Sequence, residues 1–398
     1  MSSTNTYTES GPRKATSNGG GAESRRRRRA NVLRNFGAGE QEVEELLAYN
    51  ENHFDFENVE RHQFPLDDEP FVEAWKKYAE EAREERALSS LKHHLVQLQF
   101  PIEEGISETE AYRNATLRGH RRDRHETSDT GISLEDPEAL QIEIHPTPAG
   151  HLPFLITRHR PDFTTLVRAL ARHNEPARIP ESMGAVMVAG YNNWGRIQDY
   201  RRTWEHRVTN PTEEKWREEF RRLIPRKSLY QDCFVILSNG PYSSVPAHSL
   251  GLSKTQWRSR SLDIRREHES AHYFTRRVLS SMQSNVLDEF IADYMGIVET
   301  TGRFRKEWLL QFLGLESFPE YRSGARLENY RGDPPLSESA FCVLQNLVVE
   351  AAKNVERFCT SAPRTPRGAH ALLSLAQLTL EEMASSRASS HLKSASEI

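Results

Sequence analysis

The chain has 398 residues, of which 36% are hydrophobic and 28% charged, and its net charge of −4 gives it no overall electrostatic basis for binding nucleic acid. No apolar run reaches the length of a membrane span, so no membrane partner is expected. Three scattered cysteines, at positions 233, 342 and 359, form no C-x-x-C motif, which favours a reducing, cytoplasmic compartment.

The two ends of the chain are polar and are expected to be disordered. Ser, Thr, Gly and Arg dominate residues 1–40 and an acidic segment follows, so residues 1–60 are predicted to form a charged tail. The run Arg25–Arg29 could bind nucleic acid weakly, but a solvated basic tail explains it more simply, and its charge also suits the acidic segment. The Ser-rich residues 386–398 are expected to form a second disordered tail.

The segment between these tails is predicted to be a mainly helical α+β protein with a small mixed sheet. It divides into a helical region over 61–137, a central region over 138–335 and a C-terminal helical region over 336–385. Apolar periodicity predicts helices over residues 68–98, 106–116, 163–172, 197–207, 212–223, 304–313, 336–358 and 369–384. Short apolar runs predict strands over residues 140–144, 155–157, 181–191 and 230–238.

One stretch of the central region, residues 265–298, has the features of a metal site. It contains His268-Glu269-Ser270-Ala271-His272, an H-E-x-x-H motif. Residues four apart share one face of a helix, so the two imidazoles would point the same way and could bind one ion. Glu269 is turned by about 100° around the helix axis. Its carboxylate can therefore reach a water on the metal without being a ligand.

A second predicted helix supplies further carboxylates. Glu289 follows His272 by 17 positions and Asp293 lies four residues beyond it, so both are on one helical face. A catalytic zinc takes three protein ligands and keeps one position open, which predicts His268, His272 and Glu289 as ligands. Asp293 is expected to accept the second ring N–H of a ligand histidine and so to fix its tautomer.

The ends of these two helices are predicted from turn and cap residues. Ser261 is expected to cap the first helix, which should end soon after Arg277 where Ser and Asn accumulate. The second helix should run over residues 286–298, with Asn285 and Asp288 as its capping pair. The two helices would then form an αα-hairpin whose facing sides hold the three ligands.

These residues resemble the gluzincin branch of the zincin metallopeptidases, in which H-E-x-x-H is followed by a helix with E-x-x-A/S-D. The segment Glu289–Gly296, EFIADYMG, is similar to the E-x-x-A-D-x-x-G of several members. The resemblance covers only residues 265–298, and the 17-residue gap is short for the group. It implies a zincin-like catalytic domain over 138–335, Zn2+ as cofactor, Glu269 as general base and a peptide or protein substrate. The rest of the chain resembles an uncharacterised bacterial family with no assigned activity.

No motif marks the group that would stabilise the oxyanion, for which a zinc hydrolase needs a cation or an O–H donor. The loop over residues 321–331 is dense in Arg and Tyr, and Arg326 and Tyr330 are its first candidates. Pairing of these arginines with surface carboxylates would explain the loop equally well. Further candidates are Tyr321, Arg322, Tyr242 and His248.

The strand predicted over residues 230–238 lies just upstream of the metal helix. In zincin-like folds a sheet edge at this place pairs with an extended substrate, so the resemblance implies that Ser238–Ser243 line the cleft. A plain interior strand followed by a turn is an equal alternative.

The resulting hypothesis is a zinc-dependent hydrolase, and more specifically a metallopeptidase with a metal-activated water. The first alternative is a non-catalytic zinc-binding or sensing protein whose basic tail and long helices contact partners. The second alternative is a structural interaction protein without metal. The oligomeric state does not follow from the sequence.

Overall fold

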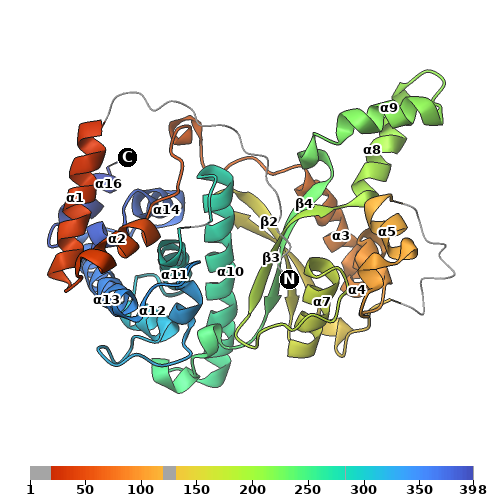
Figure 1. Cartoon of the computed structure of the whole chain (residues 1–398). Helices are drawn as coiled ribbons and strands as arrows, with labels where there is room; N and C mark the ends of the chain where they lie inside the picture. The colour runs from red at the N-terminus through yellow and green to blue at the C-terminus, as the bar shows by residue number, and fades with distance from the viewer. Residues whose placement is uncertain (1–18, 120–130, 283, 398) are drawn as a thin grey trace.

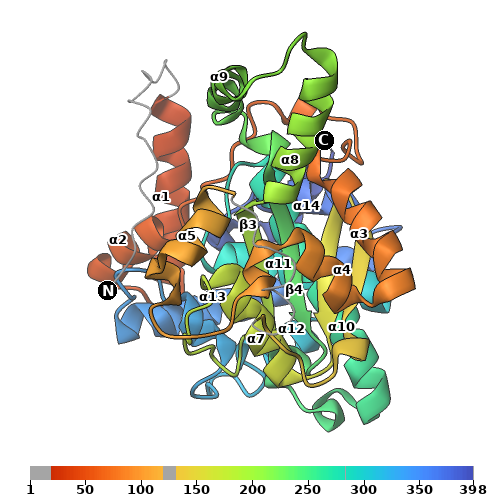
Figure 2. The ribbon, with the colours of Figure 1, turned by 90° about the vertical axis from the view of Figure 1, so that its right-hand side faces the viewer.

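A helical half and a sheet half meet along one long helix in the computed structural model, which describes residues 19–119, 131–282 and 284–397. The long helix, α10 (Lys254–Val278), lies on one side of the sheet. Helices α3 (Phe71–Glu85), α4 (Ala87–His94) and α7 (Arg160–Ala171) lie on the other side (Figures 1 and 2). The architecture is the predicted one, a mainly helical α+β fold with a small mixed sheet.

The sheet has four strands in the order β1-β2-β4-β3. Strands β1 (Gln141–Thr147) and β2 (Gly150–Thr157) form an antiparallel hairpin, β2 and β4 (Gln231–Ser238) are parallel, and β3 (Ala185–Asn192) is antiparallel to β4. The side chains of β2 and β4 are almost all buried, as expected for central strands covered on both faces. Those of β1 and β3 are partly exposed.

This strand order corrects one expectation about the sheet edge. Strand β4 is hydrogen-bonded on both sides, to β2 and to β3, so it cannot pair with a substrate and is the interior strand of the alternative interpretation. Strand β3, next to β4, is the edge strand on that side of the sheet. Its outer side pairs with no strand among the described residues.

The N-terminal segment is folded where disorder was expected. Helix α1 (Gly19–Asn35) and helix α2 (Glu40–Tyr49) pack together, and Leu33 and Leu46 are completely buried. Arg25 and Arg29 of α1 form ion pairs with the distant carboxylates of Glu382 and Glu381, which a composition argument cannot foresee. The prediction for residues 1–18 lies outside the described part of the chain.

The C-terminal end is also folded, in contrast to the predicted tail over 386–398. Helix α16 (Ala388–Ala395) buries Ala388, Leu392 and Ala395, which share one face, against α13 (Glu338–Ser361). Two predicted long helices are broken in the structure. The one over 68–98 divides at Arg86, whose φ is +77°, and the one over 369–384 divides into α14 (Gly368–Ala376) and α15 (Leu380–Ala384).

The remaining helices follow the predictions closely. They are α5 (Glu110–Leu117), α8 (Trp194–Arg207), α9 (Glu213–Leu223), α11 (Val286–Thr301) and α12 (Lys306–Leu313). Helices α8 and α9 project from the body and bury a small apolar cluster of their own (Figures 1 and 2). One hydrophobic core contains buried residues from nearly the whole described chain, from Ala30 to Ala395, and it includes both faces of the sheet and one side of α10. Within the described ranges, no helix has both the length and the apolar character to cross a membrane.

Candidate metal centre

Helix α10 is longer than the motif requires and begins with a strong cap. The Ser253 hydroxyl accepts the Gln256 N–H at 3.2 Å and the Gln256 side chain accepts the Ser253 N–H at 3.1 Å, which is a reciprocal capping box. The predicted cap at Ser261 was therefore wrong: Ser261 lies inside the helix, and its hydroxyl accepts the Tyr242 N–H at 3.0 Å. The helix ends at Val278, just after Arg277 as expected.

Helix α11 begins at Val286, but not with the expected capping pair. Asn285 has a φ of +49° and makes no capping hydrogen bond; its side-chain amide donates to the Tyr49 carbonyl at 2.7 Å. The Asp288 carboxylate accepts the Ser284 N–H, one residue earlier than predicted. The N-terminus of α11 is thus fixed by its own carboxylate and by the N-terminal segment.

The two helices form the predicted αα-hairpin, and a glycine lets them approach closely. A Cβ atom at Gly296 would lie 2.8 Å from the backbone oxygen of Ile264 on α10, which is closer than Cβ atoms approach other atoms in proteins. The close approach brings the facing sides of α10 and α11 together, with the three predicted ligands between them.

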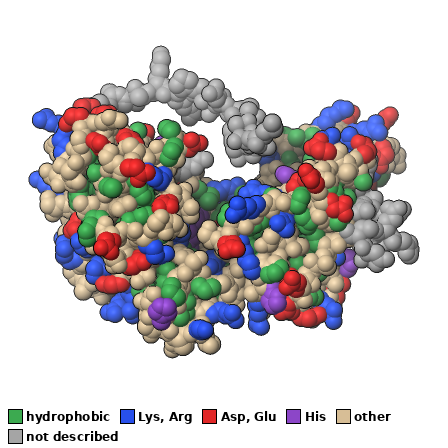
Figure 3. All heavy atoms as spheres, turned by 60° about the horizontal axis from the view of Figure 1, so that its bottom comes forward, with side chains coloured by type: hydrophobic (Ala, Val, Ile, Leu, Met, Phe, Trp, Pro, Cys, Tyr) green, Lys and Arg blue, Asp and Glu red, His purple; other side chains and the backbone are tan. Residues whose placement is uncertain are grey.

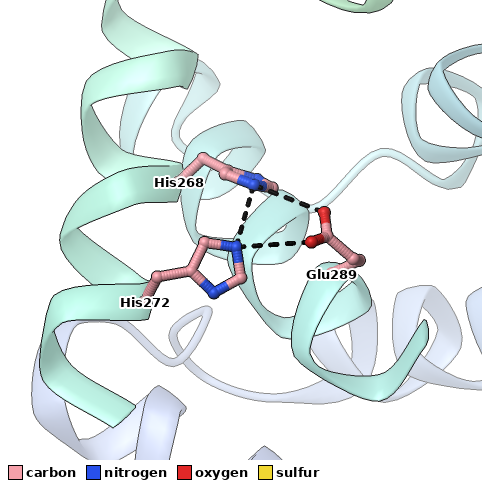
Figure 4. Close-up of side chains that lie close together, drawn as sticks. All are labelled: His268, His272 and Glu289. Carbon is pink, nitrogen blue, oxygen red and sulfur yellow. Dashed lines mark hydrogen bonds and ion pairs between the residues drawn. The ribbon is translucent and has the colours of Figure 1, made fainter. Parts of the chain in front are cut away.

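Figure 4 shows that His268, His272 and Glu289 point toward one another. The Nε2 atoms of the two histidines are 3.1 Å apart, and the nearest carboxylate oxygens of Glu289 lie 3.4 Å from His268 Nε2 and 3.6 Å from His272 Nε2. A zinc ion held at about 2.0–2.1 Å by three tetrahedral ligands separates the ligand atoms by about 3.3 Å. The observed separations lie close to that value, with a different oxygen of Glu289 nearest to each imidazole, so a small shift of the carboxylate would let the donor set hold such an ion.

The charges of these three groups depend on one another. Burial acts to lower the pKa of His272. The hydrogen bond with Glu289 and the charge of that carboxylate act in the opposite direction and more strongly, so the pKa of His272 is raised to about 9. Burial acts to raise the pKa of Glu289, and the two histidines more than offset it, so the pKa of Glu289 is well below its usual range. One oxygen of Glu289 is buried and accepts no hydrogen bond from any described residue. The carboxylate turns one oxygen toward each imidazole, and a buried oxygen without a donor among the described residues is available to bind a metal.

Behind His268 lies the predicted carboxylate. The Oδ1 atom of Asp293 is 3.0 Å from His268 Nδ1, and the Asp293 side chain is completely buried. Because a carboxylate only accepts, it holds the proton of His268 on Nδ1 and leaves Nε2 free for an ion. Asp293 also accepts from the Tyr242 hydroxyl at 2.6 Å and from the Arg326 guanidinium.

Two further carboxylates flank His272. Asp288 lies close enough for the charge of each group to shift the pKa of the other, and burial raises the pKa of Asp288 to about 6. Glu269, the predicted general base, is half-buried and accepts no hydrogen bond from a described residue, while its charge acts on Arg265 and His272. Its carboxylate is therefore free to accept a proton beside the three ligands.

The two oxyanion candidates of the 321–331 loop lie in the centre, but they are not equivalent. Arg326 donates through one Nη atom to Tyr242 at 2.7 Å and through the other to Asp293, so its donors serve the groups behind His268. Tyr330 faces Glu289, and burial together with the charge of that carboxylate raises its pKa well above the ordinary value. Tyr330 therefore keeps its proton and, unlike Arg326, has a donor that is not committed to the groups behind His268.

Three of the other candidates lie outside the centre. Tyr321 donates to the Ala325 carbonyl at 3.0 Å, Arg322 pairs with Glu316 at 2.6 Å, and His248 is exposed on the turn before Gly251. Tyr242 does reach the centre, but it lies behind His268, on the Nδ1 side of the imidazole ring. The sequence did not indicate the contacts that Tyr242 and Tyr49 make here, because these contacts join segments far apart and follow no periodic pattern.

A buried arginine joins the metal helix to the sheet. Arg265, one turn before His268, donates to the carbonyls of Ser238 at 2.7 Å and Gly240 at 3.1 Å, and burial lowers its pKa to about 10. It also lies against Gly184, the residue before β3. In the space-filling view the surface is hollowed between the helical half and the sheet half, with Lys and Arg side chains at the rim and a His side chain inside (Figure 3).

Comparison with known proteins gives a family but no activity. A model of a family of unknown function, DUF7005, matches residues 31–387. No curated protein and no solved structure matches the chain. Since the match covers nearly the whole folded part, including both helices of the metal centre, the chain belongs to the DUF7005 family.

Proposed function

We propose that the protein is a zinc-dependent hydrolase, and specifically a metallopeptidase of the zincin type. The observation that carries the proposal is the convergence of His268, His272 and Glu289 at the separations of a tetrahedral site. A purely structural zinc site would use a fourth protein ligand, and among the described residues only these three converge. The free carboxylate of Glu269 beside them favours a catalytic centre over a structural one.

Zinc bound there would acidify a water and polarise a carbonyl. Glu269 would accept the proton of the attacking water and deliver it to the leaving amine. Tyr330, protonated and facing Glu289, would donate its O–H to the oxygen that gains charge. Asp293 would keep the proton of His268 on Nδ1, and this hydrogen bond would prevent the imidazole ring from rotating.

The free edge of β3 suits an extended peptide better than the interior strand β4. Its first residues lie beside α10, because Gly184 contacts Arg265 one turn before His268. A peptide added along that edge would form main-chain hydrogen bonds with β3 and pass close to the ligands. The argument for a peptide rests on the position of the β3 edge. An amide or ester that is not part of a peptide would meet the same catalytic groups.

The proposal is tested by metal content and hydrolysis measured on the same preparations. Plasma mass spectrometry should find about one zinc per chain, less in Glu289→Ala and an unchanged amount in Glu269→Gln. A peptide library read by mass spectrometry should then reveal cleavage that Glu269→Gln slows by at least about 100-fold. Glu267→Gln is the matched control, because Glu267 is on the same helix and bonds His145 on the sheet side.

The outcomes separate the alternatives. An apoprotein that takes up no added zinc contradicts the metal centre altogether. A protein that binds zinc through Glu289 but cleaves nothing in a Glu269-dependent way is the non-catalytic zinc-binding or sensing protein. Cleavage retained in Glu269→Gln would show that the activity comes from another group or from a contaminant.

A further inference from the structure

The Tyr242 hydroxyl lies at the centre of a buried hydrogen-bond network behind the candidate metal centre. It is 2.8 Å from His268 Nδ1, donates to Asp293 Oδ1 at 2.6 Å and accepts from Arg326 Nη1 at 2.7 Å. Tyr242 is only 4% exposed, so these three groups take the place of water around its oxygen. Burial and the charge of Asp293 hold its pKa well above the ordinary value, which keeps the hydroxyl a donor.

The tyrosine is itself fixed from several sides. Its N–H donates to Ser261 on α10, and its ring packs edge-on against Phe312 of α12 at a centroid distance of 4.8 Å. Two guanidinium groups also lie near its ring, those of Arg265 at 5.5 Å and Arg326 at 5.2 Å from the centroid. A side chain held this firmly can in turn hold the carboxylate to which it donates.

Two pairs of residues spaced four apart face each other across the centre. Helix α11 contributes Glu289 and Asp293, and the short helix η8 (Arg326–Tyr330) contributes Tyr330 opposite Glu289 and Arg326 opposite Asp293. Each carboxylate that serves the candidate ion therefore has its own partner on η8. Arg326 bonds Tyr242 and Asp293 at once, a geometry for which the forked guanidinium is suited and a single ammonium is not.

Building on the proposed zinc site, we propose that Tyr242 and Arg326 are positioning residues that fix Asp293, and through it the His268 ring, in the orientation that binds the ion. They touch no substrate and no reacting atom. Without the Tyr242 hydroxyl, Asp293 Oδ1 keeps only His268 as a partner, and one donor of Arg326 loses its buried acceptor. The carboxylate and the imidazole can then rotate, and zinc affinity falls.

The test uses two substitutions that preserve charge, so that long-range repulsion of the cation by Arg326 does not change. The zinc dissociation constant of the full chain is measured by competition with a coloured chelator for wild type, Tyr242→Phe and Arg326→Lys. Each should bind zinc about tenfold more weakly, the lower end of the effect of such outer partners. The visible absorption of Co2+ in the site should change in both variants, because it depends on ligand geometry.

Matched controls come from the same loop. Tyr321→Phe and Arg322→Lys make the same chemical changes where the side chains bond Ala325 and Glu316 away from the centre, and they should leave zinc affinity unchanged. Thermal unfolding of the zinc-free forms shows whether a variant is folded. If one positioning variant fails to fold, the other still decides the result.

Failure of this inference can be distinguished from failure of the proposed function. Wild-type affinity in both Tyr242→Phe and Arg326→Lys overturns the positioning role but leaves the zinc hydrolase intact. Weaker binding in both, with no hydrolysis by the wild type, supports the positioning role and removes only the catalytic proposal. A wild type that binds no zinc overturns both.

Discussion

At the scale of single residues, the Asp288 side chain has two roles: it caps helix α11, and it places a negative charge near the proposed ligands. One of its oxygens accepts the Ser284 N–H and so caps α11, while the other accepts no hydrogen bond from a described residue. The charge of the carboxylate also acts on His272. The cap affects stability, and the charge would affect metal binding at the candidate centre. The two contributions can be separated by two substitutions.

We expect Asp288→Asn to keep the cap, because its amide oxygen still accepts the Ser284 N–H, while removing the negative charge beside His272. Zinc should bind several-fold more weakly with little change in the free energy of unfolding of the zinc-free form. Asp288→Ala should in addition lose about 1 kcal/mol of stability with the cap. Urea denaturation and chelator competition measure the two effects, and equal zinc affinities for wild type and Asp288→Asn would contradict the electrostatic part.

His145 gives the protein a pH-dependent contribution to stability at a place away from the metal centre. Burial lowers the pKa of His145, but hydrogen bonds with Glu143 and Glu267 raise it above the ordinary 6.5. A group whose pKa is higher in the folded state stabilises the fold fully below 6.5, and this stabilisation is lost as the pH rises through the folded-state pKa. His145→Gln should therefore cost more stability at pH 6 than at pH 9. Urea denaturation at both pH values measures it, and a cost independent of pH would contradict it.

At the scale of elements, the hairpin of α10 and α11 depends on one close contact. The ligands are on different helices, so a small separation of the helices moves Glu289 away from the two histidines. Gly296 sets this separation, because its missing side chain allows contact with the Ile264 backbone. The glycine thus links the packing of two helices to the geometry of the centre.

Gly296→Ala is expected to destabilise the protein by about 1–3 kcal/mol through overpacking and to weaken zinc binding at the same time. Gly240→Ala is a suitable control, because the nearest atom to its added Cβ would be a Ser238 hydroxyl at 3.8 Å. Thermal unfolding and chelator competition on both variants check the prediction. A destabilised Gly296→Ala with unchanged zinc affinity would show that the centre tolerates helix separation.

Local patterns explain which elements could be predicted. Each of the four predicted strands overlaps an observed one, and the H-E-x-x-H and E-x-x-x-D spacings place the right residues face to face. The break at Arg86 has no Gly or Pro to mark it, and the strand order depends on pairings that no single segment contains. Tyr242 reaches Asp293 across 51 positions, so its role follows from the assembled fold alone.

At the scale of the whole molecule, the N-terminal segment binds the C-terminal end. Arg29 pairs with the completely buried carboxylate of Glu381 at 3.2 Å, and Arg25 pairs with Glu382 at 2.6 Å. Two arginines of the run that the sequence offered for nucleic acid are therefore engaged within the chain. Composition predicted a tail because the carboxylates that neutralise these arginines lie at the other end of the sequence.

We expect Arg29→Met to destabilise the protein by about 3 kcal/mol or more, because Glu381 would remain buried without its cation. Arg27→Met is the matched control, since Arg27 is exposed on the same helix and no ion pair of it is found in the described structure; it should change stability by less than about 0.5 kcal/mol. Urea denaturation compares the two. Equal small effects would show that Asn50 alone suffices for Glu381.

The pairing of α1 with α15 also bears on how the protein is made. Arg29 and Glu381 are 352 positions apart, so at about 5–20 residues per second the ribosome needs roughly 20–70 s to supply the partner. During that time α1 can pack against α2, but it lacks its partners on α15. A product that stops before residue 381 therefore cannot form this contact.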